Sequence, residues 1–244
     1  MKINLDYELI GKNEPAVVLM HGWGMDKKSF EKLVPLIKNN QKILSLDFFG
    51  FGKSSEPREY FDTYEYACYV FLLLKKLNIK NVILVGHSFG GRIAILLSSI
   101  FKLNVSSLIL TSSAGINKFS IVKKLKIFRY KFLKSLAKYK IVNKKYLEKF
   151  GSVDYKKANL YLKKVFVSVV NQDLKYLLYK IDSKCTLIWD KKDKETPYSI
   201  CNILNRKIKN SKILNYSNGG HFAFLYNINK FADVINKCFI DINL

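Results

Sequence analysis

A ten-residue stretch near the middle of the chain, V-I-L-V-G-H-S-F-G-G at positions 82–91, constrains the fold more than any other. A β-branched apolar run ends in a glycine-flanked serine, Ser88, and an apolar segment with helical spacing follows. This order predicts a strand, a tight turn and a helix, with the serine in an unfavourable backbone conformation. Gly86 and Gly90 stand where a β-carbon would clash. The stretch therefore predicts an exposed, nucleophilic Ser88 and places the N–H of Phe89 at a helix start; the alternative is a serine that only caps the helix.

Length and composition limit the class of protein. With 244 residues, 49% of them hydrophobic, the chain can form one large α/β domain or one domain with an insertion. The four cysteines lack a C-x-x-C pair, which favours buried or half-buried free thiols in a reducing compartment over a zinc site or disulfides. The N-terminus lacks a signal-peptide core, and the longest apolar run, 66–74, is too short to span a bilayer. We therefore predict a soluble, cytoplasmic protein.

The formal net charge of +23 comes almost entirely from lysine, because arginine occurs only at positions 58, 92, 129 and 206. Surfaces that bind nucleic acid usually use arginine for bidentate contacts. The sequence also has no helix-turn-helix, zinc-finger or RNP signature. A solvated lysine surface is therefore favoured, and we expect no nucleic-acid partner.

Apolar runs of strand length alternate with segments of helical spacing along most of the chain. The expected strands are 2–10, 16–20, 43–46, 82–86, 105–110, 185–189 and 212–216. The expected helices are 27–39, 63–77 with Asp62 as N-cap, 92–101, one that starts at 196–197, and 222–239. This alternation predicts an α/β fold, with a mostly parallel central sheet and helices on both faces.

The alternation breaks between residues 117 and 164, where 16 basic residues occur with only two acidic ones. Apolar residues at 121, 125, 128, 132, 136 and 139 have helical spacing, and a second helical pattern covers 155–170. Because ligands bind at the carboxyl ends of the strands in such sheets, we expect this helical segment to form an insertion there. An insertion that covers a pocket is favoured over docking of this basic segment on an anionic membrane surface.

Three candidate catalytic side chains follow strands, in the order Ser88, Asp193, His221. A serine hydroxyl at its free pKa needs an imidazole as base, and the imidazole needs a carboxylate to fix its tautomer. Of the three histidines, only His221 stands in an independent loop, after two glycines. His21 is expected to bond its own loop, and His87 lies inside the Ser88 turn.

The loop after Trp189 offers three carboxylates to His221. Asp190 directly follows the strand, where it is expected to belong to the sheet edge or to bond loop amides. Glu195 has a longer, less restrained side chain that we expect to face solvent. Asp193 lies deeper in the turn, so we predict that it serves the histidine.

Five motifs in order resemble those of the α/β-hydrolase family, over nearly the whole chain. They are H-G-W-G at 21–24, D-F-F-G-F-G-K-S at 47–54, G-H-S-F-G-G at 86–91, D-K-E-T-P at 193–197 and G-G-H-F at 219–222. The resemblance implies Ser88 as nucleophile, His221 as base and Asp193 as acid. It also implies the backbone N–H groups of Trp23 and Phe89 as the oxyanion hole. The segment 117–178 would be the lid, on a core formed by 1–116 and 179–244. One departure is Asp190, at a position where relatives commonly have glycine.

The function that this resemblance implies is hydrolysis of an ester or similar small carbonyl compound through an acyl-enzyme. The partner would be a small-molecule acyl substrate, and the enzyme a serine hydrolase of the carboxylesterase kind. This function implies no cofactor and no metal ion. Two alternatives remain: a carbon–carbon bond hydrolase, thioester hydrolase or lyase on the same framework, or a non-catalytic ligand-binding member. We expect Asp47 to pin its turn. The ring of Trp23 is expected either to contact substrate or to pack.

Overall fold

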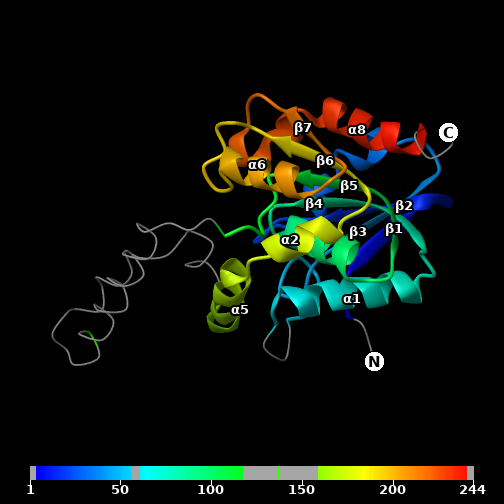
Figure 1. Ribbon diagram of the computed structural model, residues 1–244. Helices are drawn as coiled ribbons and strands as arrows, with labels where there is room; N and C mark the ends of the chain where they lie inside the picture. The colour runs from blue at the N-terminus through cyan, green and yellow to red at the C-terminus, as the bar shows by residue number, and fades with distance from the viewer. Residues whose placement is uncertain (1–3, 57–60, 118–136, 138–158, 241–244) are drawn as a thin grey trace.

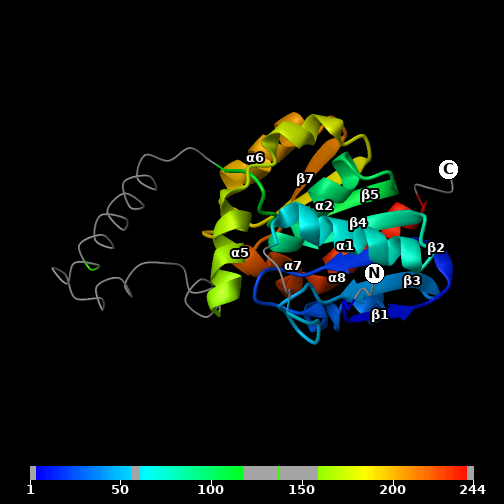
Figure 2. The ribbon, with the colours of Figure 1, turned by 90° about the horizontal axis from the view of Figure 1, so that it is seen from below.

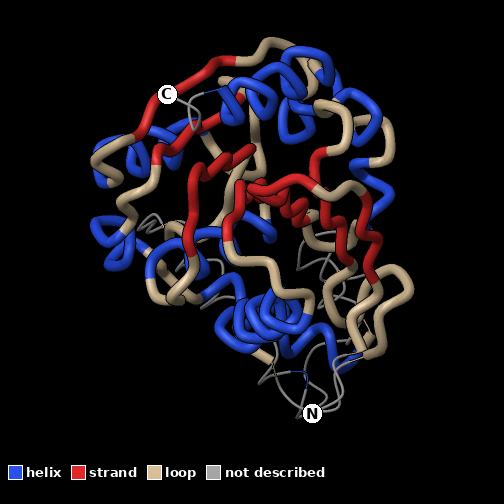
Figure 3. The backbone as a smooth tube through the Cα atoms, turned by 90° about the vertical axis from the view of Figure 1, so that its right-hand side faces the viewer, coloured by secondary structure: helices blue, strands red, loops and turns tan. Residues whose placement is uncertain are grey.

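The computed structural model describes residues 4–56, 61–117, 137 and 159–240. Seven strands form one sheet in the order β1-β3-β2-β4-β5-β6-β7. β1 pairs antiparallel with β3, and the other five pairings are parallel. Figure 3 shows the strands as a twisted layer with helices on either side. The strands are β1 (Tyr7–Ile10), β2 (Asn13–Met20), β3 (Gln41–Leu46), β4 (Asn81–His87), β5 (Asn104–Thr111), β6 (Lys184–Trp189) and β7 (Ser211–Asn215).

Two hydrophobic clusters hold helices against the two faces of the sheet. One cluster packs α1 (Thr63–Lys76), α2 (Phe89–Ser99), α6 (Tyr198–Lys207) and the 3₁₀ helix η4 (Lys175–Lys180) against one face. The other packs α8 (Ile228–Ile240) and the short α7 (Ala223–Tyr226) against the opposite face. Figure 1 shows α1 and α8 on opposite sides of the strands. The predicted fold class is therefore confirmed, and β4 is buried at six of its seven residues, as expected of a central parallel strand.

One helix of the segment predicted as a lid, α5 (Leu160–Asn171), lies beyond the carboxyl ends of the strands, against the loops after β2 and β3. Figures 1 and 2 both show it beside the same end of the sheet. The helical pattern at 155–170 is confirmed where it falls on α5. Residues 118–136 and 138–158 lie outside the described residues, so the extent of the lid stays a prediction.

Local sequence signals explain how α1 begins. The side chain of Asp62 accepts hydrogen bonds from the N–H groups of Tyr64 and Glu65, and Glu65 accepts one from the N–H of Asp62. This reciprocal capping box satisfies donors that a helix start leaves unpaired. The predicted N-cap is confirmed.

Two predicted helices differ in the structure. Residues 27–39 form two 3₁₀ helices, η1 (Lys27–Phe30) and η2 (Val34–Leu36), because Pro35 lacks an N–H for an α-helical bond. Phe30, Leu33 and Ile37 of this segment are nevertheless buried. Residues 222–239 are broken into the 3₁₀ helix η5 (Gly220–Phe222), α7 and α8. The side-chain amide of Asn227 donates to two backbone carbonyls at the break between α7 and α8.

No helix in the described part of the chain is long and apolar enough to cross a membrane. All four cysteines are free thiols, and three of them are buried. Cys68 is exposed on α1, which corrects the expectation that every thiol is buried or half-buried. The spacing of α1 places it on the outer face of the helix, away from the sheet.

Candidate active site

Ser88 occupies the tight turn between β4 and α2. Its φ of 48° and ψ of −108° lie outside the helical and strand regions, which is the strained conformation predicted for this serine. A β-carbon on Gly90 would lie 2.1 Å from the carbonyl oxygen of Met20, and one on Gly86 would lie 2.6 Å from that of Gly90. Both positions therefore require glycine. The Ser88 side chain is half-buried and makes no hydrogen bond within the described residues, so its hydroxyl is available at the carboxyl end of β4.

Asp193 and His221 come together from the loops after β6 and β7. The Nδ1 atom of His221 lies 3.0 Å from Oδ2 of Asp193, and both side chains are buried. The Thr196 hydroxyl lies 2.7 Å from the same carboxylate oxygen. Burial raises the pKa of Asp193, but the hydrogen bond and charge of His221 and the donors of Thr196 lower it overall, below its ordinary value. Asp193 therefore stays ionised and holds a proton on Nδ1 of His221.

Asp190 has a different set of partners. One carboxylate oxygen accepts from the N–H of Lys192 at 2.8 Å, and the other accepts from the N–H of Gly220 at 2.9 Å. The second bond ties the loop after β6 to the residue before His221. The expectation that Asp190 bonds loop amides agrees with this geometry, and the structure places Asp193 rather than Asp190 against His221.

The second imidazole nitrogen of His221 faces away from Asp193. Its Nε2 atom lies 3.5 Å from Oε2 of Glu195, whose side chain is 61% exposed, as expected for a residue that faces solvent. No hydrogen bond joins Ser88 to His221 within the described part of the chain. The two loops are nevertheless in contact, because the ring of His87, next to Ser88, lies 4.9 Å from the ring of His221 between centroids. Hydrogen bonds between catalytic groups often tighten only when substrate binds.

The backbone N–H groups of Trp23 and Phe89 are candidate donors to a reacting oxygen. Phe89 is the first residue of α2, where an N–H has no acceptor within the helix. Within the described residues, neither N–H donates to another group. The loop that carries Trp23 is fixed by His21, which donates from Nδ1 to the carbonyl of Gly22 and accepts from the N–H of Phe48 on Nε2. His21 thus has the structural role that the sequence predicted.

The turn after β3 is pinned by Asp47, as predicted. Its two carboxylate oxygens accept from the N–H groups of Lys27 and Lys53, at 2.7 and 2.8 Å. The buried ammonium group of Lys27 lies 3.5 Å from the same carboxylate. Asp47 is therefore committed to the fold and has no free oxygen for chemistry at Ser88.

A family model described as the alpha/beta hydrolase fold matches residues 15–148, more than half of the chain. The chain belongs to the α/β-hydrolase fold family. Among similar proteins, the AB hydrolase superfamily protein YisY of Bacillus subtilis (strain 168) is 29% identical over 245 residues, covering 91% of this chain and 90% of the relative. The uncharacterized hydrolase YugF of the same organism is 25% identical over 242 residues, covering 91% and 89%.

Solved structures agree with this family over almost the whole length. An esterase (EaEST) from Exiguobacterium antarcticum has a TM-score of 0.72 at 21% identity, covering 96% of this chain and 94% of its own. MenH from S. aureus has a TM-score of 0.71 at 18% identity, covering 98% and 99%. At these identities the likeness shows the fold. The coarse description of the protein is therefore a hydrolase of the α/β-hydrolase fold.

Two residues of this α/β-hydrolase site were missed by reasoning from the sequence. Thr196 was predicted only to start a helix, yet its hydroxyl lies within 3.3 Å of both Asp193 and His221. Its position three residues after Asp193 was a usable signal, because such a threonine can donate back to the carboxylate. His87 was assigned only to the turn, and nothing in the sequence indicates that its ring packs on His221.

His21 and His87 are fully buried and neutral in the folded hydrolase. Loss of hydration lowers the pKa of His21 to about 4. Loss of hydration, and then the charge of His221, lower the pKa of His87 to about 3. Nδ1 of His87 donates to the carbonyl of Thr111 at 3.2 Å, which leaves Nε2 without a hydrogen. Both rings therefore resist protonation until well below the ordinary histidine pKa.

We expect this burial to make the protein sensitive to mild acid. The unfolded chain takes up a proton on each histidine near pH 6.5, whereas the folded chain does not until pH 3–4. The free energy of unfolding should therefore fall as the pH decreases below 6.5, by about 1.4 kcal/mol per pH unit for each histidine. Urea unfolding of the parent and of His87→Gln at pH 7, 6, 5 and 4.5 measures this. A plot of the free energy of unfolding against pH should be less steep for the variant, by the contribution of one histidine. Equal slopes would contradict the lowered pKa of His87 in the folded protein.

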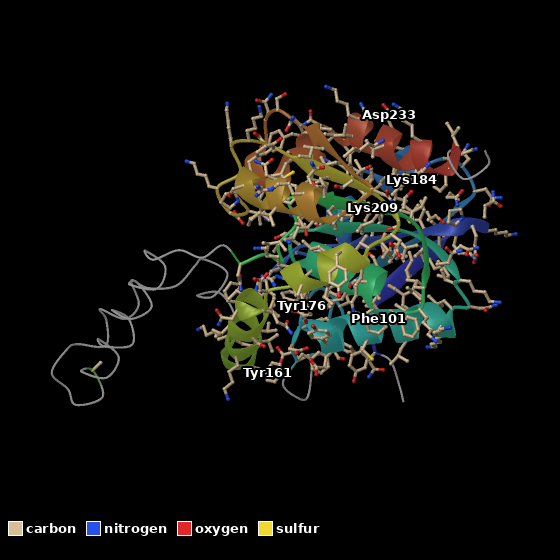
Figure 4. All side chains as sticks on the ribbon, viewed as in Figure 1. Phe101, Tyr161, Tyr176, Lys184, Lys209 and Asp233 are labelled. Carbon is tan, nitrogen blue, oxygen red and sulfur yellow. The ribbon has the colours of Figure 1, made fainter. Side chains whose placement is uncertain are left out.

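A cavity of about 280 Å³ lies away from these residues, between the amino-terminal halves of β6 and β7 and helix α8. Lys184, which lines it, appears on the β6 side of the molecule in Figure 4. Ser88, Asp193 and His221 do not line this cavity. Within the described ranges, no group of three or more His, Cys, Asp or Glu side chains could hold a metal ion.

Proposed function

We propose that this chain is a serine hydrolase that cleaves an ester or a similar small carbonyl compound through an acyl-enzyme, with Ser88, Asp193 and His221 as its triad. The observation that carries the proposal is the buried pair of Asp193 and His221, 3.0 Å apart, whose loop packs against the strained turn of Ser88. A buried carboxylate on one imidazole nitrogen leaves the other as a base.

The reaction begins when Oγ of Ser88 attacks the substrate carbonyl and Nε2 of His221 takes its proton. The charge of Asp193 stabilises the imidazolium that forms. The N–H groups of Trp23 and Phe89 donate to the oxyanion, and each such donor contributes about 3–4 kcal/mol in enzymes where one has been removed. His221 then returns the proton to the leaving alcohol, and an ester bond to Ser88 remains.

Deacylation uses the same groups in reverse. His221 removes a proton from water, whose oxygen attacks the acyl carbon, and the proton then passes to Oγ of Ser88 as the acid leaves. Apart from the substrate and this water, both halves of the cycle use only groups of the chain. Thioesters and activated carbon–carbon bonds would use the same residues, so a graded series of oxygen esters, thioesters and diketones would distinguish these substrate classes.

The proposed lid, 117–178, would cover this site, with α5 as its described part. A small acyl substrate would bind between the lid and the carboxyl ends of the strands, where sheets of this topology bind ligands. The aromatic rings around Trp23 suit an apolar acyl group.

Labelling with a fluorophosphonate tests the nucleophile directly. We expect one covalent adduct per chain, located by peptide mapping on Ser88, because the reagent needs both an activated serine and oxyanion donors. Ser88→Ala should lose the label, and Ser112→Ala should keep it. Absence of a label on the folded protein would instead support a non-catalytic, ligand-binding member of the fold.

A further inference from the structure

The side chain of Trp23 is held by three phenylalanine rings. Its indole meets Phe51, Phe89 and Phe166 edge-to-face, with centroids 4.9, 5.4 and 5.0 Å apart. Edge-to-face contacts at this separation are favourable and depend on orientation. Two of the rings belong to the core, but Phe166 comes from α5. One side of the Trp23 ring is therefore packed against helix α5.

The backbone at Trp23 forms a turn, in which the N–H of Met25 donates to the carbonyl of Gly22 at 3.2 Å. Gly22 precedes it and Gly24, with a φ of 73°, follows it, so neither neighbour restricts the chain sterically. An N–H that must face a reacting oxygen at 2.7–3.1 Å needs a firmly held backbone. The packing of the indole ring adds to the support that the hydrogen bonds of His21 give this loop.

Helix α5 is itself fixed to the core along its length. Val165 and Val169 are buried in the same hydrophobic cluster as α1 and α2. Leu162 packs so closely over Gly50 that a β-carbon there would lie 2.7 Å from it. Tyr161, labelled in Figure 4, also packs against this cluster. The inner face of α5 therefore presents Phe166 to Trp23 from a rigid element.

Both ends of α5 are tied by hydrogen bonds. At the start, the side chain of Asn159 donates to Glu56 at 2.7 Å. At the end, Gln172 accepts from the N–H of Thr63 at 3.0 Å and donates to Asp62 at 3.1 Å. The carbonyl of Gln172 also accepts from the buried guanidinium of Arg92, on the helix that follows Ser88.

We propose that Phe166 is a positioning residue, which holds the N–H of Trp23 in the oxyanion hole by packing against the indole ring from α5. This inference rests on the proposed role of the Trp23 N–H. Phe166 acts through Trp23, so its effect should appear in the transition state, where the oxyanion exists, rather than in binding of the ground state.

The test compares three substitutions at Phe166 with a neighbour on the same helix. Phe166→Ala should lower kcat for a p-nitrophenyl ester by about 10- to 100-fold with KM changed less than threefold, because small misplacements at such sites cost up to about 100-fold. Phe166→Leu should lower kcat less, and Phe166→Tyr should keep the parent's kcat because it keeps the ring. Val167→Ala, at an exposed position, should match the parent.

Tryptophan fluorescence gives a readout that is independent of activity. Trp23 and Trp189 are the two tryptophans of the chain, and Trp189 is fully buried with its indole N–H bonded to Thr196. Phe166→Ala should shift the Trp23 emission to the red, and the shift should vanish when Trp23→Phe is added. Val167→Ala should leave the spectrum unchanged.

Two results would overturn the inference. One is a kcat equal to the parent's in both Phe166→Ala and Phe166→Leu although the Trp23 emission has shifted. The other is a raised KM with kcat unchanged, which would make Phe166 part of the substrate wall. Ser88→Ala, measured in parallel, separates this from the proposed function. If that variant stays active, the nucleophile assignment fails, and if it is inactive while the Phe166 variants match the parent, only the positioning role fails.

Discussion

Ser88→Ala should lower turnover of a p-nitrophenyl ester by roughly four to six powers of ten while the fold stays intact. The loss is large because alanine removes the only atom that forms the covalent bond, and His221 and the two N–H groups then have nothing to activate or stabilise. Steady-state hydrolysis measures the loss, and far-UV circular dichroism should be unchanged. Retention of more than a tenth of the activity would remove Ser88 from the nucleophile role.

The fold should survive this change for a local reason. The Ser88 side chain makes no hydrogen bond within the described residues, and serine and alanine pay a similar cost at a φ of 48°. Ser112 is a matched control. It follows the neighbouring strand β5 and has a φ of 44°, and its buried hydroxyl has no hydrogen-bond partner among the residues that the structure describes. Ser112→Ala should therefore keep both stability and activity, which would separate the loss at Ser88 from any general effect of such a substitution.

The centre of the sheet could be predicted because the strands there are buried on both faces. A continuous apolar run such as Val82–Val85 needs no partner information to be recognised as a central strand, and its length is limited by the turn that follows. Helices were harder to delimit. The 27–39 segment has apolar residues at helical spacing, but Pro35 prevents a continuous α-helix. At 222–239 the side chain of Asn227 ends one helix and the next begins, which periodicity alone does not register.

The candidate site was predictable where a residue's role depends on its own loop. Ser88, Asp193 and His221 each follow a strand, so parallel topology brings them to one edge of the sheet. The contacts of His87 with His221 and of Phe166 with Trp23 join distant segments, and no local pattern encodes them. Thr196 lies only three residues after Asp193, so its hydrogen bond to that carboxylate had a local signal. The choice between Asp190 and Asp193 could be predicted only in part. Position in the turn favoured Asp193, but the reason is visible only in the hydrogen bonds: Asp193 contacts His221, whereas Asp190 accepts from backbone N–H groups.

Asp193→Asn should keep the fold and lower the rate by about four powers of ten, because the amide would favour the wrong histidine tautomer. The structure fixes how the amide would lie. Oδ1 of Asp193 accepts from the N–H groups of Glu195 and Thr196, both at 2.9 Å, so the amide oxygen would keep that place. The amide nitrogen would then face Nδ1 of His221 and donate to it. The imidazole proton would move to Nε2, which could no longer accept the proton of Ser88.

Asp190→Asn is the matched control, since it makes the same change three residues earlier in the same loop. Both Asp190 oxygens accept from backbone N–H groups, of Lys192 and Gly220, so an amide nitrogen would oppose one donor. A buried donor left unpaired costs about 1–3 kcal/mol of stability. Because Asp190 does not contact the imidazole, the rate should fall less than tenfold. Nitrogen-15 NMR of His221 should show the proton on Nε2 in Asp193→Asn and on Nδ1 in Asp190→Asn. If Asp190→Asn were inactive and Asp193→Asn near normal, then Asp190 would be the acid.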